Sequence, residues 1–198
     1  MPTFEIERRH WAAGRRFVAG LDEAGRGCLA GPVIAAAVVL PPDALLPGLD
    51  DSKRLSPEQR AASYERIHAE ALAVGVGLCS PEEIDRLNVL RATLEAMRRA
   101  VADLALTPDL LLVDGNQPLT APPCAQETVV QGDTRCLSIA AASVVAKVTR
   151  DRLMVALDRD FPHYGWARHK GYPTAEHYAA LAAHGPCLHH RRTFRLTR

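Results

Sequence analysis

The sequence has few aromatic residues and no long hydrophobic run. Aromatic residues make up 5% of its 198 residues, although hydrophobic residues of all kinds make up 47%. A core would therefore rest on aliphatic side chains. No apolar stretch approaches the roughly 18 residues of a membrane-spanning helix. The arginine-rich first residues also lack the apolar segment of a signal peptide. We therefore expect a globular, cytoplasmic protein that does not enter a membrane.

Cysteine pairs with metal-binding spacing are also missing. The chain has five cysteines, an odd number, and none forms a Cys-x-x-Cys pair. This pattern argues against a disulfide framework and against a zinc site. It favours a reducing compartment. The chain has no G-x-x-x-x-G-K-[S/T] loop either, so nothing indicates a nucleoside triphosphatase.

Net charge is small, but the charge is unevenly distributed. The whole chain carries +1, yet residues 162–198 contain six Lys and Arg residues against a single acid, Glu176, and six of the eight histidines. A basic end beside an acidic body fits a carboxylate cluster that binds metal and a separate face that binds phosphates. For residues 191–198 a solvated, poorly ordered tail is an equal alternative.

Apolar periodicity predicts an α/β domain with a mixed sheet flanked by helices. Residues 17–21 and 33–40 are expected to form neighbouring antiparallel strands, and residues 74–78, 110–113 and 127–130 further strands. Helices are expected over residues 57–73, 80–106 with a break at Asn88, 138–160 and 174–184. Residues 163–173 are expected to form a loop.

Acidic residues follow several of these strands directly. Asp22 and Glu23 come after the first strand, Asp114 after residues 110–113, and Asp133 shortly after Val130. Strand ends are where ligand sites assemble in open α/β sheets, so these carboxylates can converge. Consecutive strand residues face opposite sides, so Glu23 is the less certain ligand of the group. Oxygen ligands without His or Cys favour Mg²⁺ or Mn²⁺, and two such ions can hydrolyse a phosphodiester.

Several ordered motifs carry a resemblance to a known family. The stretch Gly25-Arg26-Gly27 follows the first two acids, and further blocks occur in order along the chain. With these blocks the chain resembles the bacterial ribonuclease HII family, the type 2 branch of ribonuclease H, over residues 17–194. The blocks comprise residues 22–33, 49–56, 84–93, 113–115, 132–133, 138–151 and 169–174.

The resemblance implies a fold and an activity. The expected fold is ribonuclease H-like α/β, with a mixed five-stranded sheet flanked by helices and a helical C-terminal part. The catalytic core would span residues 1–160, and the basic segment 161–198 would contribute to substrate binding. The implied activity is cleavage of the RNA in RNA–DNA hybrids and nicking of DNA 5′ to a single ribonucleotide, leaving 3′-hydroxyl and 5′-phosphate ends.

The resemblance also implies roles for individual residues. The four acids Asp22, Glu23, Asp114 and Asp133 would be catalytic and would hold two Mg²⁺ or Mn²⁺ ions during catalysis. The 2′-hydroxyl would be read by Gly25, Arg26, Gly27 and Tyr172. Lys53 would contact a phosphate near the scissile bond. Lys147 and Arg150 share one helix face, and either nucleic-acid contact or pairing with Asp151 is expected for them.

Two alternatives remain open at this point. One is a ribonuclease H-like endonuclease that acts on DNA or on junctions, and the other is a catalytically silent hybrid-binding module. A monomer is expected. No extended tail that could carry a sliding-clamp peptide follows Phe194, so recruitment to replication machinery is not expected.

Overall fold

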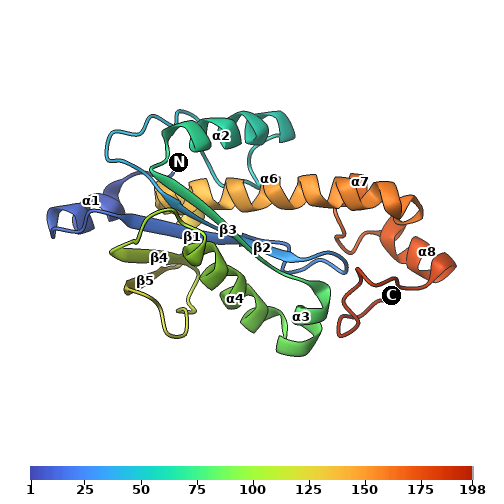
Figure 1. Cartoon of the computed structure of the whole chain (residues 1–198). Coiled ribbons are helices and arrows are strands. Elements are labelled where there is room, and N and C mark those ends of the chain that lie inside the picture. The colour runs from blue at the N-terminus through green and yellow to red at the C-terminus, as the bar shows by residue number, and fades with distance from the viewer. Residues whose placement is uncertain (198) are drawn as a thin grey trace.

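A five-stranded mixed sheet forms the centre of the fold. In the computed structural model, which describes residues 1–197, the strands are β1 (Val18–Ala24), β2 (Val33–Val39), β3 (Ala73–Cys79), β4 (Leu110–Asp114) and β5 (Ala125–Val129). Their spatial order is β3-β2-β1-β4-β5 (Figure 1). The pairs β1–β2 and β2–β3 are antiparallel, whereas β1–β4 and β4–β5 are parallel. The expected mixed five-stranded sheet is confirmed. Arg198, part of the basic end noted above, lies outside the described residues.

The helices agree with the expected ones, with a few additions. They are α1 (Glu5–Ala12), α2 (Pro57–Glu70), α3 (Pro81–Leu87), α4 (Val89–Ala102), α5 (Gly132–Arg135), α6 (Leu137–Asp160), α7 (Trp166–His169) and α8 (Ala175–His184), with a 3-10 turn η1 (Pro162–Tyr164). Ser56 and Ser80 begin α2 and α3 with reciprocal capping boxes. Within residues 1–197, no helix has both the length and the apolar character needed to cross a bilayer.

Helices cover both faces of the sheet. The layer containing α2 and α6 lies on one face, and α4 lies on the other. Alternate residues of β2 enter the two layers, because Ala36 and Val38 pack towards α6 while Ala35 and Ala37 pack towards α4. Every residue of β2 is buried as a result.

Glycines in the strands allow the helices to approach closely. A Cβ atom at Gly20 in β1 would lie 2.2 Å from the backbone of Ser138 in α6. A Cβ atom at Gly77 in β3 would lie 2.1 Å from the carbonyl oxygen of Ala96 in α4. The glycines that lower the strand propensity of β3 are therefore the positions where α4 contacts it.

Two parts of the chain differ from the sequence-based expectation. Helix α1 was not expected, because its sequence is mostly charged; Glu7 within it is buried and accepts a hydrogen bond from the backbone N–H of Ser138 at 2.8 Å, near the start of α6. The expected loop over residues 163–173 contains most of η1 and all of α7. Helices this short leave no periodic apolar pattern to recognise.

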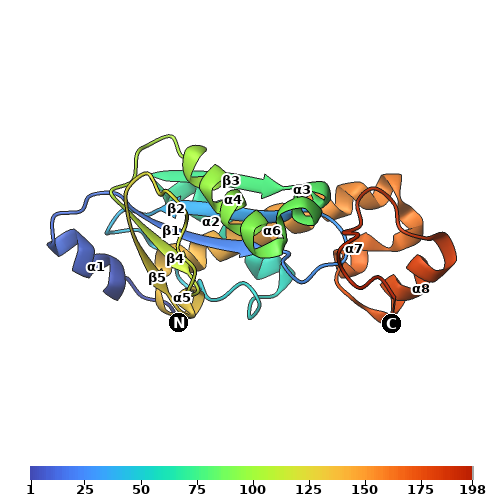
Figure 2. The same cartoon turned by 90° about the horizontal axis from the view of Figure 1, so that it is seen from below.

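The C-terminal part of the chain packs at the far end of α6. Figure 2 shows α7, α8 and the C-terminus gathered there, away from α1. Met154 of α6, Tyr164, Trp166 and Ala30 form a buried cluster in this region. Ala30 belongs to the loop between β1 and β2, so the C-terminal part contacts the loop that follows the first acids.

Candidate active site

Asp22 and Asp114 lie side by side on two parallel strands. Leu21 of β1 pairs with Val113 of β4, so the next residue of each strand is a carboxylate. Asp22 is 5% exposed. Its carboxylate accepts a hydrogen bond from the backbone N–H of Glu23 at 2.7 Å. Ser143 of α6 lies beside it and acts against the rise in its pKa that burial causes, while the Ser143 hydroxyl donates to Ser52 at 2.7 Å. The expected convergence of strand-end acids is present for this pair.

Asp133 reaches the same region from α5. A left-handed residue, Gln131, turns the chain after β5, and the N–H of Gly132 donates to Asp114 Oδ1 at 2.7 Å. Lys53, from the loop before α2, places its Nζ 3.1 Å from Asp133 Oδ2. The structure thus brings Lys53 and three of the four acids together, although they are far apart in the sequence.

Glu23 faces the other side of the strand, as strand geometry requires. β1 remains paired with β2 through Ala24, so the strand does not end between the two acids. The Glu23 carboxylate receives a hydrogen bond from Arg26 at 3.2 Å and borders a small cavity near Thr93 of α4. Asp114, the last residue of β4, lines the same cavity. It is therefore the acid that links Asp22 and Glu23.

Burial and mutual repulsion disfavour ionisation of these acids. Burial raises the pKa of Asp22 well above its usual value, and the charges of Glu23 and Asp114 add to the effect. Burial is also the largest cause of the raised pKa values of Glu23 and Asp114. Among residues 1–197, no three acidic, imidazole or thiol groups already stand at metal-ligand spacing. A donor set made only of carboxylate oxygens nevertheless fits hard divalent cations, whose charge would offset the repulsion.

The Gly25-Arg26-Gly27 stretch follows β1 directly, beside these acids. Gly25 has φ +97°, a left-handed conformation that favours glycine. A Cβ atom there would lie 2.1 Å from Arg150 Nε. Gly27 differs, because a Cβ atom there would have no atom within 4 Å. The fold therefore explains a glycine at position 25 and does not explain one at position 27.

Two buried arginines hold this loop from inside the protein. Arg150 donates to the carbonyl oxygens of Pro32, Ala30 and Lys170 at 2.9–3.0 Å. Arg191 donates to those of Gly31, Arg26 and Gly25 at 2.7–3.0 Å. Both are 0% exposed.

The structure corrects two expectations here. Arg150 neither meets solvent nor pairs with Asp151, because its guanidinium is used by backbone carbonyls. Arg191 is not part of a solvated tail. Sequence reasoning found no role for Arg191, and a buried arginine has no local signal that distinguishes it from an exposed one.

Tyr172 lies on a turn that is joined to the loop between β1 and β2, residues 25–32, which we call the glycine loop. The N–H of Leu29 donates to the carbonyl of Gly171 at 2.8 Å. The Tyr172 phenol lies near the buried Cys28 thiol, which adds to the effect of burial in raising the pKa of the phenol, and its side chain remains 37% exposed. Lys147 lies over its ring, with Nζ 5.2 Å from the ring centroid. The two elements expected to read the 2′-hydroxyl therefore form one continuous surface.

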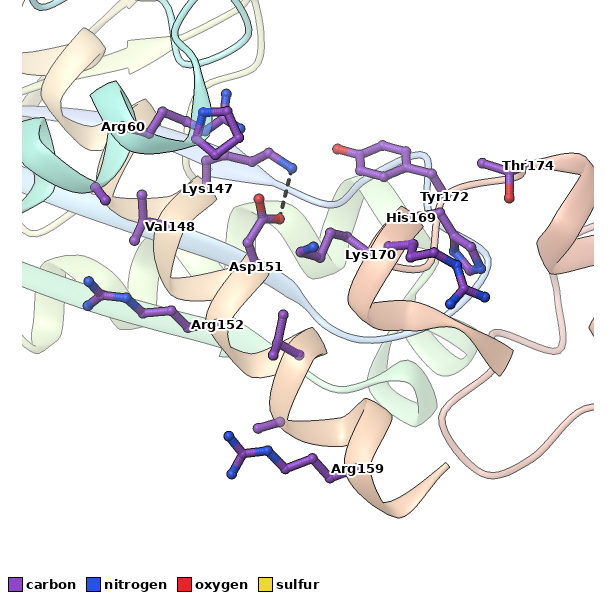
Figure 3. A pocket seen from close by; sticks show the side chains of 15 residues that line it. Arg60, Lys147, Val148, Asp151, Arg152, Arg159, His169, Lys170, Tyr172 and Thr174 are labelled. Carbon is purple, nitrogen blue, oxygen red and sulfur yellow. Dashed lines mark hydrogen bonds and ion pairs between the residues drawn. The ribbon is translucent and has the colours of Figure 1, made fainter. Parts of the chain in front are cut away.

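A groove of about 820 Å³ begins at Tyr172 and follows α6 (Figure 3). Val148 and Val155 of α6 contribute apolar lining. One acid, Asp151, lines it, and Lys147 is paired with that acid at 2.8 Å. The pairing considered for Lys147 is thus present. The cations lining the groove are Arg60, Lys147, Arg152, Arg159, Arg168 and Lys170.

A pair of buried histidines lies behind the Tyr172 turn. His177 Nδ1 is 3.0 Å from the carbonyl oxygen of Tyr172, so this nitrogen carries the hydrogen. His190 Nδ1 accepts from the N–H of Cys187, so His190 donates from Nε2 to His177 Nε2 at 3.1 Å. Trp166 donates to the same acceptor at 3.2 Å. This pattern requires both imidazoles to be neutral.

We expect the histidine pair to make the protein sensitive to acid. Burial, followed by the neighbouring His177, lowers the pKa of His190 to about 4; the free side chain titrates near 6.5. The stability that the neutral ring contributes is present above pH 6.5 and is lost as the pH falls towards 4. Denaturant unfolding should show a loss of about 2 kcal/mol over this range. The His190→Asn variant should show a correspondingly smaller loss, and equal losses would contradict the assignment.

Comparisons with known proteins agree with this arrangement. The family model described as Ribonuclease HII matches residues 19–197. The "Ribonuclease HII" of Syntrophotalea carbinolica is 58% identical over 190 residues, covering 96% of this chain and 90% of the relative. The crystal structure of ribonuclease H2 from Pyrococcus horikoshii superimposes with a TM-score of 0.76 at 27% identity, covering 92% and 96% of the two chains.

A more distant structure shares the fold. The "Bst-RNase HIII in complex with Mn2+" has a TM-score of 0.75 at 17% identity, covering 91% of this chain and 68% of that one. The ribonuclease H-like architecture expected from the sequence is thus confirmed. Because the family model spans nearly the whole chain and the bacterial relative is similar over almost all of its length, this protein belongs to the ribonuclease HII family.

Proposed function

We propose that the protein cuts the phosphodiester bond on the 5′ side of a ribonucleotide, leaving 3′-hydroxyl and 5′-phosphate ends. As a ribonuclease HII, it cleaves the RNA of RNA–DNA hybrids and nicks DNA at single embedded ribonucleotides. The position of the glycine loop is the observation that supports cutting on the 5′ side of the ribonucleotide. The loop begins at Gly25, two residues after Glu23, and is joined to the Tyr172 turn, so the surface proposed to recognise the ribose (the reading surface) adjoins the acids.

The four acids are the proposed ligands of two divalent cations. Asp22 and Asp114 are adjacent, Asp133 is linked to Asp114 through Gly132, and Glu23 approaches from the opposite side of β1. Bound Mg²⁺ or Mn²⁺ would supply activation of water and stabilisation of the leaving oxygen. The N–H of Glu23 donates to the Asp22 carboxylate and orients it.

Recognition of the ribose is assigned to the glycine loop and Tyr172. Arg26 and Gly27 are exposed, and within residues 1–197 their backbone N–H groups donate to no carbonyl. The missing side chain at Gly27 lets a sugar approach these donors. A 2′-hydroxyl is the group that separates RNA from DNA at one nucleotide, and it can accept such hydrogen bonds.

Phosphate binding is assigned to Lys53 and to the basic groove. Lys53 is 76% exposed while its ammonium contacts Asp133, so it can bind a phosphate at the acids. The groove along α6 adds cations above an apolar floor, an arrangement that suits a sugar–phosphate backbone. Within the groove, Lys147 lies beside Tyr172.

Three duplexes test the proposal: one with a single ribonucleotide, one all-DNA, and one RNA–DNA hybrid, each with and without Mn²⁺ or Mg²⁺. We expect metal-dependent cutting of the first and the third only. Equal cutting of the ribonucleotide and all-DNA duplexes would favour a DNA or junction endonuclease. Binding without cutting under either metal would favour a silent binding module.

Removal of the Tyr172 hydroxyl should distinguish ribose recognition from phosphodiester cleavage. The Tyr172→Phe variant keeps the ring and loses the phenol oxygen, so we expect about a tenfold loss of kcat/KM on the single-ribonucleotide duplex and a smaller loss on a long hybrid. Tyr64→Phe is the matched control, since Tyr64 lies on α2 with its ring tilted against that of His68. Equal losses on both substrates would contradict the role of Tyr172.

A further inference from the structure

We infer that the consecutive residues His190 and Arg191 are positioning residues for ribose recognition, Arg191 for the glycine loop and His190 for the Tyr172 turn. Neither residue would touch the substrate. The inference rests on the proposed function, because it concerns how the reading surface is held. It makes the segment after α8 a part of the specificity of the enzyme.

Arg191 determines the direction of the peptide groups in the glycine loop. It donates to the carbonyl oxygens of Gly25, at 2.7 Å, and of Arg26, at 2.8 Å. In a trans peptide the C=O and the next N–H point in opposite directions, and no cis bond occurs in the described chain. Carbonyls held inward at Gly25 and Arg26 therefore turn the N–H groups of Arg26 and Gly27 outward. These are the donors proposed for the 2′-hydroxyl.

An arginine suits this position better than a lysine. A planar guanidinium presents five donors in a fixed fork, and Arg191 uses three nitrogens on three carbonyls. A lysine ammonium is a compact point charge and cannot span the same three oxygens. Among the described residues Arg191 forms no ion pair with a carboxylate at 4 Å or less. Its buried charge is compensated by backbone dipoles and by the Phe194 ring, whose centroid lies 5.1 Å from Cζ.

His190 acts on the other half of the reading surface. Its Nε2 donates to His177, and His177 in turn donates to the carbonyl oxygen of Tyr172. The backbone completes the same connection, since Ala30 forms a β-bridge with His190 and the N–H of Gly31 donates to the carbonyl of His189. Residues 190 and 191 thus join the glycine loop and the tyrosine turn through side chains that point to each.

Asp85 anchors the segment that carries these residues. Its carboxylate accepts from the backbone N–H of Arg192 at 2.8 Å and from the N–H and hydroxyl of Thr193 at 3.0 and 2.6 Å. Asp85 lies in α3 and has no contact with the glycine loop in these hydrogen bonds. This gives a role to Asp85, a residue of the 84–93 motif that takes no part in the acid cluster or in the proposed ribose-recognition surface.

The test compares Arg191→Lys with Arg192→Lys, two neighbouring changes that preserve charge. Arg191 is buried and Arg192 is exposed. Dissociation constants are measured without divalent metal for the single-ribonucleotide duplex and for the all-DNA duplex of the same sequence. We expect Arg191→Lys to reduce the preference for the ribonucleotide duplex about tenfold, and Arg192→Lys to keep it. Equal weakening on both duplexes, or an unchanged preference, would overturn the inference.

A second variant covers the case in which Arg191→Lys does not fold. Asp85→Asn loosens the anchor without touching Arg191, and we expect it to reduce the same preference by a smaller factor, about threefold. An unchanged preference in Asp85→Asn, with unchanged folding by circular dichroism, would then count against the inference. The wild-type protein separates the two questions: if it shows no ribonucleotide preference in binding or cutting, the proposed function fails before the variants are compared.

Discussion

Replacement of Asp22 by asparagine is expected to abolish cleavage and to stabilise the metal-free protein. Asp22 is 5% exposed and lies beside Glu23 and Asp114, and burial is the main cause of its strongly raised pKa. Such a group stabilises the fold while protonated, below about pH 3.8, and this contribution is lost as the pH rises through the raised pKa. Above the raised pKa the ionised carboxylate destabilises the fold, whereas a neutral amide of the same shape carries no charge into the interior.

Thermal unfolding in a chelator at pH 7.5 measures this effect. We expect Asp22→Asn to gain about 1–2 kcal/mol, while kcat/KM falls roughly a thousandfold because a proposed metal ligand is lost. Asp43→Asn, an exposed acid before α2, is the matched control and should change neither quantity. Added Mn²⁺ should stabilise the wild-type protein more than the variant. A lower unfolding midpoint for Asp22→Asn in the chelator would contradict the conclusion that the buried charge of this carboxylate destabilises the fold.

The second large effect is expected at Gly27. A Cβ atom there meets no protein atom within 4 Å, so Gly27→Ala should change the free energy of unfolding by no more than about 0.5 kcal/mol. The same methyl group would stand where the ribose approaches the backbone donors. We expect cleavage of the single-ribonucleotide duplex to fall about a hundredfold.

Gly25→Ala provides the contrast. Its Cβ atom would lie 2.1 Å from Arg150 Nε and its φ is +97°, so this variant should lose activity through loss of stability. Chemical denaturation and kcat/KM measured on both variants separate the two causes. Full activity in Gly27→Ala would show that the substrate does not approach this position closely.

Local patterns allowed much of the fold to be predicted. The serine caps of α2 and α3, the break at Asn88 and the apolar run of β4 are each determined by residues near in sequence, and all appear where expected. Strand ends likewise predicted that Asp22 and Asp114 would meet. Glu23 followed the alternation of the strand, which was the stated reason to doubt it as a ligand.

Contacts between distant residues account for what was missed. Arg191 binds the Gly25 carbonyl across 166 positions, and Arg150 binds Ala30 across 120. Nothing in the neighbourhood of either arginine in the sequence distinguishes a buried guanidinium from a solvated one. The same holds for Glu7, whose role near the start of α6 lies 131 positions away.

Helix α6 connects the acids, the basic groove and the glycine loop. Along α6, Ser143 lies beside Asp22, Lys147 borders the groove, Arg150 binds the carbonyl oxygens of the glycine loop and Met154 packs in the C-terminal cluster. A continuous helix of 24 residues, about 36 Å long, has little freedom to shorten or stretch. We therefore expect the spacing between the ribose that is recognised and the phosphate that is cut to be constant, so that every substrate is cut at the same bond relative to its ribonucleotide.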